Sequence, residues 1–210
     1  MKYGIIIALE SELGPKFLKK WKKVKDKWAT FYKKKNKKDE AVLIFSGVGR
    51  VNASIATSYL IQVQKVNIIV NIGSCGANNK KLKKGSVHHI SRAKYIDVDN
   101  RIFEYEICQI PREKVWFEID YIKPAGKHLS LGSSESFVGC KNKHKFNISK
   151  DVDIIDMEGA GIIQTANKLH FNNLVMVKIV SDSIHSTTDK WRKEIINVHT
   201  IMEAFIKKII

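Results

Sequence analysis

The chain has 210 residues, 44% of them hydrophobic, and carries a formal net charge of +16. This length suits one domain over residues 1–210, and the hydrophobic content suffices for a sizeable core, which excludes a disordered chain. No apolar run approaches the roughly 18 residues of a membrane-spanning helix, and the run after Met1 ends at Glu10, too early for a secretory signal. The three cysteines have the spacing of neither a disulfide framework nor a metal site. We therefore expect a cytoplasmic protein with no membrane partner and no metal or cofactor.

The lysines are concentrated in two segments, 16–27 and 33–38. Such an excess of positive charge can mark a protein that binds nucleic acid or an anionic surface. However, both segments lack arginine, whose guanidinium is favoured for recognising phosphates and bases. We expect a solvated, lysine-rich face and no nucleic-acid partner. A non-catalytic basic binding module is the alternative, and its affinity for nucleic acid would fall steeply with salt.

The predicted elements of the first half begin with a buried strand at 3–8, apolar on both faces. A helix is expected from about residue 11 to Lys23, although Gly14-Pro15 leaves its start open. Strands follow at 28–33 and 41–45, joined by a polar turn at 36–40. A helix from about 50 to 63 and a buried strand at 66–72 complete this half.

The second half is richer in short strands, which we expect at 87–90, 93–98, 128–132 and 152–155. Residues 111–127 show no clear helical stripe. A helix should begin near Gly159, a buried strand should occupy 174–180, and a last helix should start at Thr187 or Thr188, because threonine is a good N-cap. Short apolar strands that alternate with helices predict one α/β domain with three layers.

Unusual residues follow five of the predicted strands. They are Glu10 with Glu12, the segment 46–50, the segment 73–76, Asp156 with Glu158, and Ser181 with Asp182. In open α/β sheets, ligands bind at the carboxyl ends of the strands. Three acidic strand ends suggest acid–base chemistry on a hydroxyl-rich substrate such as a sugar or nucleoside. The alternative is that the acids complement helix dipoles and the glycines allow tight turns.

Five segments carry a resemblance to a known family: Ala-Leu-Glu-Ser-Glu at 8–12, Ser-Gly-Val-Gly-Arg at 46–50, Asn-Ile-Gly-Ser-Cys-Gly at 71–76, Asp-Met-Glu-Gly-Ala at 156–160 and Val-Ser-Asp at 180–182. They resemble, in the same order, the signature segments of the nucleoside phosphorylase/nucleosidase superfamily. Within it, the resemblance is greatest to the bacterial 5'-methylthioadenosine/S-adenosylhomocysteine nucleosidases. The resemblance implies a three-layer α/β/α sandwich around a mixed, partly barrel-like sheet, and a homodimer that acts on a purine nucleoside.

The resemblance also implies the catalytic roles. Asp182 matches the acid that gives a proton to purine N7, and Ser181 would orient it. An aspartate can do this near neutral pH only if desolvation or a hydrogen bond holds its proton. Glu12 matches the glutamate that activates the attacking water. Glu158 matches the one that binds the ribose hydroxyls and favours the positive charge that develops on the sugar.

The remaining pocket residues are likewise implied by the resemblance. Met157 would pack under the ribose, Phe137 would stack on the base, and Val138 would offer backbone groups to the base edge. The others are Ser74, Cys75 and Gly76 beside the base and water, Leu9 and Val48 beyond the 5' carbon, and Trp191 as a cover. Each has a plainer alternative: Asp182 as a turn cap, Glu12 as a first-turn helix acid, and Phe137 and Met157 as core residues.

Three activities of this fold remain open. We favour hydrolysis of an adenine nucleoside with a 5'-thio substituent. Phosphorolysis would need a cationic cradle for phosphate, whereas the chain has five arginines, and Glu12 would repel an anion at that place. Hydrolysis of futalosine or aminodeoxyfutalosine uses the same chemistry with a carboxyphenyl group at the 5' carbon.

The sequence departs from the nucleosidase pattern at three places. Lys178 stands where an arginine is usual. The compact ammonium of lysine then replaces a planar guanidinium, and any bidentate contact is lost. Glu135 replaces a usual aspartate, and residues 111–127 are shorter than the corresponding stretch. In the family, that region contributes to the dimer and to the neighbour's 5' pocket. These departures leave the 5' substituent and the dimer open.

Overall fold

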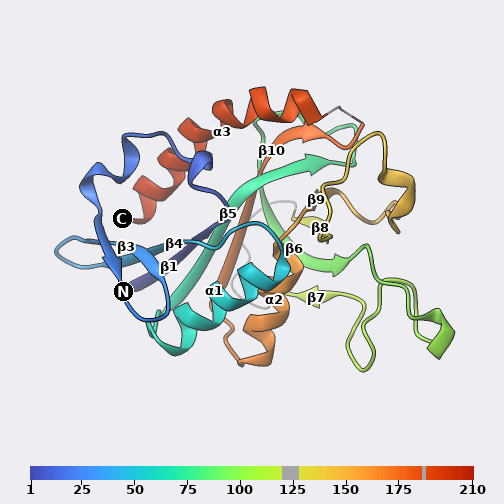
Figure 1. The fold of residues 1–210 in the computed structure, drawn as a ribbon, viewed down its shortest axis with the longest axis horizontal. Coiled ribbons are helices and arrows are strands. Elements are labelled where there is room, and N and C mark those ends of the chain that lie inside the picture. The colour runs from blue at the N-terminus through green and yellow to red at the C-terminus, as the bar shows by residue number, and fades with distance from the viewer. Residues whose placement is uncertain (120–127, 186–187) are drawn as a thin grey trace.

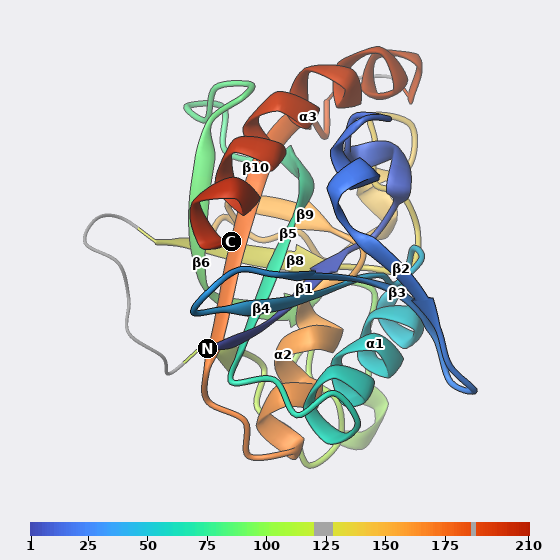
Figure 2. The same ribbon diagram turned by 90° about the vertical axis from the view of Figure 1, so that its left-hand side faces the viewer.

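The computed structural model describes residues 1–119, 128–185 and 188–210, with the backbone alone for 188–197. In these residues the strands are β1 (Lys2–Ile7), β2 (Lys22–Lys25), β3 (Thr30–Lys35), β4 (Glu40–Phe45), β5 (Ile68–Ala77), β6 (Val87–Tyr95), β7 (Phe117–Glu118), β8 (Leu129–Ser133), β9 (Ile154–Asp156) and β10 (Leu174–Ser183). The α-helices are α1 (Arg50–Gln62), α2 (Gly159–Lys168) and α3 (Thr188–Ile209). Helices α1 and α2 cover one side of the sheet and α3 covers the other (Figures 1 and 2). The predicted three-layer α/β architecture is therefore confirmed.

Part of the mixed sheet closes on itself. Strand β10 pairs in parallel with β5 and antiparallel with β6, while β6, β8, β9 and β5 pair in succession. These five strands form a ring. From β5 the sheet continues as an open extension through β1, β4, β3 and β2. The partly barrel-like sheet that the resemblance implied is present.

Alternation along β1 explains why this strand is apolar on both faces. Ile5 and Ile7 belong to the core cluster beneath α3, which also contains Met202. Ile6 belongs to the cluster that includes α1 and α2. Successive side chains of a strand point to opposite faces, so a strand between two helical layers must be apolar at every position. Each of the three isoleucines is fully buried, and each such burial contributes about 2 kcal/mol.

The prediction of a helix from residue 11 to Lys23 is wrong. The chain forms two short 3-10 helices there, Glu10–Glu12 and Phe17–Lys20, and then enters β2. Its apolar spacing has another cause, since Leu13 and Trp21 are buried in the cluster beneath α3. Residues after Trp21 instead pair with β3, which would otherwise be the edge of the sheet.

Two strands extend further than predicted. Strand β5 continues through Gly-Ser-Cys-Gly to Ala77, and β10 continues through Ser181 and Asp182 to Ser183. The two strands pair along this extension, with a bulge between Val180 and Asp182. Strand β6 is continuous, whereas two pieces were predicted. Residues 120–127, part of the region 111–127 that was predicted to be short, lie outside the described residues. In the described part of the chain, no helix is long and apolar enough to span a membrane.

Candidate active site

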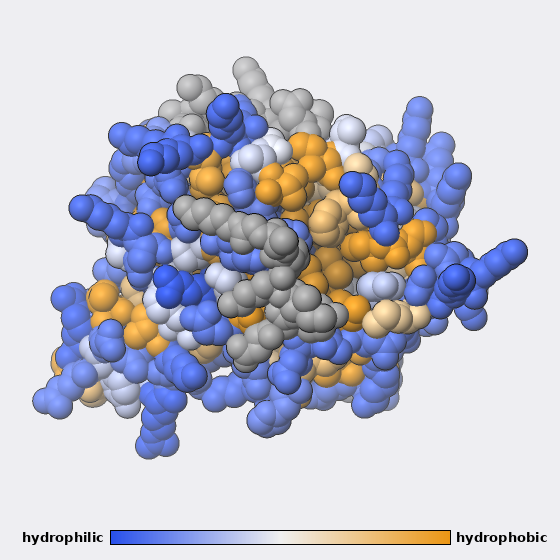
Figure 3. All heavy atoms as spheres, turned by 180° about the vertical axis from the view of Figure 1, so that it is seen from behind, coloured by the Kyte–Doolittle hydropathy of each residue, from blue (hydrophilic) through white to orange (hydrophobic). Residues whose placement is uncertain are grey.

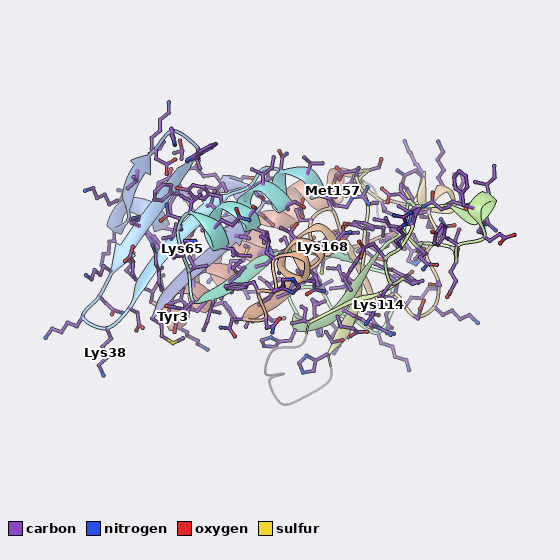
Figure 4. All side chains as sticks on the ribbon, turned by 90° about the horizontal axis from the view of Figure 1, so that it is seen from below. Tyr3, Lys38, Lys65, Lys114, Met157 and Lys168 are labelled. Atoms are coloured by element: carbon purple, nitrogen blue, oxygen red, sulfur yellow. The ribbon has the colours of Figure 1, made fainter. Side chains whose placement is uncertain are left out.

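A cavity of about 250 Å³ opens where the ends of β1, β5, β9 and β10 meet. It is also lined by the segment that follows β8 and by the two residues that precede α2, one of which, Met157, is labelled in Figure 4. The cavity brings together the following predicted site residues: Leu9, Glu12, Val48, Ser74, Cys75, Gly76, Phe137, Val138, Met157, Glu158 and Asp182. Ser181 lies behind the wall and contacts Asp182. The side chain of Trp191 lies outside the described residues.

Glu12 is buried and held by neutral donors. The Ser74 backbone N–H and hydroxyl both donate to its Oε1 at 2.8 Å. The Leu9 backbone N–H donates to Oε2 at 3.2 Å. The helical segment here is a single 3-10 turn, so Glu12 does not lie at the start of a long helix whose dipole it could complement. The contacts to Ser74 join the 3-10 helix Glu10–Glu12 to β5 and fix the direction in which Glu12 faces the cavity.

Asp182 lies at the bulge of β10, a feature that re-aims side chains. Burial raises the pKa of its carboxyl group. The Ser181 Oγ is 2.7 Å from Asp182 Oδ1 and 3.2 Å from the Cys75 carbonyl oxygen. A single hydroxyl hydrogen serves one acceptor at a time. If Asp182 is protonated, its O–H can donate to Ser181 while Ser181 donates to Cys75, so this arrangement suits an acid that holds its proton.

Glu158 occupies the N-cap position of α2 and is also buried. Its Oε1 accepts the Gly49 N–H at 3.0 Å. Gly49 has a φ of 101°, and a Cβ there would lie 2.7 Å from Glu135 Oε2. Only glycine therefore fits at position 49. Burial, together with the neighbouring Asp156 carboxylate, raises the pKa of Glu158 to about 7.

The structure adds a buried ion pair whose role the sequence did not reveal. The Lys178 Nζ lies 2.7 Å from Asp156 Oδ2, and both side chains are 1% exposed. Burial alone would lower the pKa of Lys178, but the Asp156 and Glu158 carboxylates raise it above its usual value. The signal in the sequence was a lone lysine within the apolar run of β10. Such a residue needs a buried partner.

The other cavity residues supply shape more than charge. Phe137 and Met157 are half-buried, and Val48 is exposed at the mouth. Burial raises the pKa of the Cys75 thiol, so it remains protonated and lines the wall. The described residues include no group of three His, Cys, Asp or Glu side chains placed to hold a metal ion.

A family model described as the phosphorylase superfamily matches residues 2–123, more than half of the chain. The chain belongs to the phosphorylase superfamily.

Relatives within this superfamily share most of the chain's length. A 5'-methylthioadenosine/S-adenosylhomocysteine nucleosidase of Staphylococcus aureus (strain bovine RF122 / ET3-1) is 32% identical over 198 residues, 85% of each chain. The structure of the same-named nucleosidase from S. pneumoniae with a transition-state inhibitor, MT-ImmA, superposes with a TM-score of 0.82 at 26% identity, over 99% of both chains. A futalosine hydrolase of Helicobacter pylori strain 26695 superposes with a TM-score of 0.87 at 20% identity, over 99% of this chain and 96% of that one. At that identity the last match shows the shared fold alone.

Proposed function

We propose that this protein hydrolyses the N-glycosidic bond of 5'-methylthioadenosine and S-adenosylhomocysteine and releases adenine. The observation that carries the proposal is one cavity lined by Glu12, Glu158 and Asp182 in three different environments. A glycosidic bond is broken efficiently when an acid protonates the leaving group and a base activates water. Relatives named as nucleosidases of these two substrates support the same activity.

Each carboxyl group has its own role in the proposed reaction. Asp182 donates its proton to N7 of the purine, so that the bond from C1' to N9 breaks with its electron pair going to the base. The ribose then carries positive charge, which Glu158 stabilises while it binds the ribose hydroxyls. Glu12 accepts a proton from the water whose oxygen bonds to C1'. One proton leaves Asp182 and one reaches Glu12, so the enzyme's net charge is unchanged.

The charges around the cavity favour water over phosphate as the nucleophile. Lys178 is the one cation among the described residues that line it, and Lys178 is already paired with Asp156. Arg50, at the start of α1, makes two 2.8 Å contacts with Asp97 and one of 2.9 Å with Glu135. Buried carboxylates with committed cations oppose a phosphate dianion.

The partner surfaces are also part of the proposal. Val51 and Ile55, one helical turn apart on α1, are exposed, as are Ile102 and Phe103 in the projecting segment between β6 and β7 (Figure 1). Figure 3 shows apolar side chains at the end of the molecule that carries this segment. We expect a second copy of the chain to cover these apolar residues, since exposed patches of this kind mark interfaces.

The lysine-rich face is expected to be solvated and to bind no nucleic acid. Lys38, near the tip of the β3–β4 hairpin, lies at the opposite end of the molecule from that projecting segment and well away from Met157 (Figure 4). Most lysines of the two segments are exposed. The reaction we propose therefore leaves this surface unused, as expected for an enzyme that acts on a small nucleoside in the cytoplasm.

A nucleoside panel tests the proposal. We expect free adenine from 5'-methylthioadenosine and from S-adenosylhomocysteine at the same rate with and without phosphate. A rate that depends strictly on phosphate would establish phosphorolysis instead. A higher kcat/KM for futalosine or aminodeoxyfutalosine than for either thio-nucleoside would contradict the proposed substrates.

A further inference from the structure

The cavity holds more buried acid than buried base. Apart from Asp182, the proposed proton donor, three acids line it and are each at most 8% exposed: Glu12, Asp156 and Glu158. Among the described lining residues, Lys178 is the one cation. A buried carboxylate without a counter-charge is costly, so the position of this single ammonium matters for all three acids.

Asp156 is itself held rigidly. Its Oδ1 accepts the Ser133 hydroxyl at 2.5 Å, and its carboxylate accepts the Gly159 backbone N–H at 2.9 and 3.1 Å. The Ser133 oxygen in turn accepts the Ala160 N–H at 2.9 Å. The first turn of α2 and the end of β8 therefore fix Asp156, and Asp156 fixes Lys178.

Lys178 and Glu12 approach each other above a glycine. A Cβ placed on Gly73 would lie 3.4 Å from Lys178 Nζ and 3.7 Å from Glu12 Oε1. The two charged groups therefore face the same space over the backbone of β5. Lys178 also acts electrostatically on Glu158, which is the second acid assigned to the reacting sugar.

We propose that Asp156 is a positioning residue for this reaction: it anchors the Lys178 ammonium on the cavity floor, where that charge offsets Glu12 and Glu158 together. Without Asp156, Lys178 is free to form a direct pair with one of these two acids, which would remove that acid from its role. The proposal rests on the hydrolase function argued above.

A double-mutant cycle in kcat tests the proposal. Asp156→Asn, Lys178→Met and the double variant are assayed for adenine release from 5'-methylthioadenosine, with KM, the pH profile of kcat and Tm measured for each. We expect each variant to lose about 100-fold in kcat, with KM changed less. We expect the kcat of the double variant to be no lower than that of the less active single variant, because the two residues act as one unit. The acid limb of the pH profile of Lys178→Met should move to higher pH, since loss of positive charge disfavours ionised carboxylates.

Controls separate this role from a structural one. Lys178→Arg keeps the charge and should retain more activity than Lys178→Met. Asp151→Asn removes the partner of Lys94, another buried lysine that lies outside the cavity, and should leave kcat unchanged. If a single variant fails to fold, the double variant decides, because it removes both members of the Asp156–Lys178 pair and leaves neither buried without its partner. A folded double variant with the wild-type kcat would overturn the positioning role.

The possible results are distinct. A wild-type protein that releases no adenine overturns the proposed function. An active wild type, together with folded variants that keep its kcat and its pH profile and lose only Tm, overturns the positioning role of Asp156.

Discussion

At the scale of single residues, different neighbours give two buried acids of the same type different roles. Asp182 lies beside a serine hydroxyl in a site whose burial favours the protonated form. Asp156 lies against an ammonium ion and is an acceptor for two further donors. Two aspartates in one cavity can therefore serve as a proton donor and as a fixed anion, because their neighbours differ.

The raised pKa of Glu158 gives a stability that depends on pH. Because its pKa rises from 4.5 to about 7 on folding, the folded state holds this proton more tightly than the unfolded chain. The stabilisation is fully present below pH 4.5 and is lost as the pH rises towards 7, amounting to no more than roughly 3 kcal/mol. Urea unfolding of the wild type and of Glu158→Gln at pH 5 and pH 7.5 measures this effect. We expect the difference between the two proteins to change with pH, and a constant difference would contradict the raised pKa.

At the scale of elements, the sequence predicted which segments are strands better than where they end. The pattern of apolar residues located β1, β4, β5 and β10, because both faces of these strands are buried. Gly-Ser-Cys-Gly and Ser-Asp have turn-like composition, yet they lie inside β5 and β10. Their conformation depends on pairing between segments about 100 residues apart, which local sequence does not encode.

The candidate site was predictable to a similar degree. Motifs indicated the residues that line the cavity, since all the strand ends that carry them meet there. The Asp156–Lys178 pair was not predictable, because it depends on the register of β9 and β10 within the barrel. The prediction of a helix at 11–23 was wrong for a related reason: Leu13 and Trp21 pack beneath the distant helix α3, and Lys22–Lys25 pair with the next strand, β3.

The β2–β3 hairpin contains an unfavourable pair of charges. Lys22 lies directly across from Lys33, and like charges at such positions destabilise a sheet. We expect Lys22→Glu to raise the free energy of unfolding by about 0.5 kcal/mol at low salt and to leave kcat unchanged. Lys25→Glu, which faces Thr30, is the matched control and should have a smaller effect. Equal effects of the two substitutions in urea unfolding would show that only net charge matters.

At the scale of the whole molecule, the apolar surface at one end is the feature that a monomer does not explain. Phe103 is 68% exposed in the projecting segment. We expect Phe103→Asp to weaken or abolish the proposed dimer, because the change places a charge in the proposed interface while leaving the core intact. Size-exclusion chromatography with light scattering measures the mass. Trp28→Asp, a substitution of a similarly exposed aromatic residue in the turn between β2 and β3, should leave the proposed dimer intact.

If the wild-type protein is a monomer at all concentrations tested, the proposed homodimer is wrong. If Phe103→Asp remains a dimer, the interface lies on another surface.

In the proposed reaction, Asp182 supplies the proton that releases adenine while Glu12 activates water. The most direct measurement is the single-turnover release of adenine from 5'-methylthioadenosine by wild type, Asp182→Asn and Glu12→Gln, with nucleoside binding measured in parallel. We expect each variant to bind the nucleoside yet to lose roughly 100- to 10,000-fold in rate, since each loses one partner of the acid–base pair. A variant of either residue that binds the nucleoside and releases adenine at the wild-type rate would contradict the role proposed for that residue.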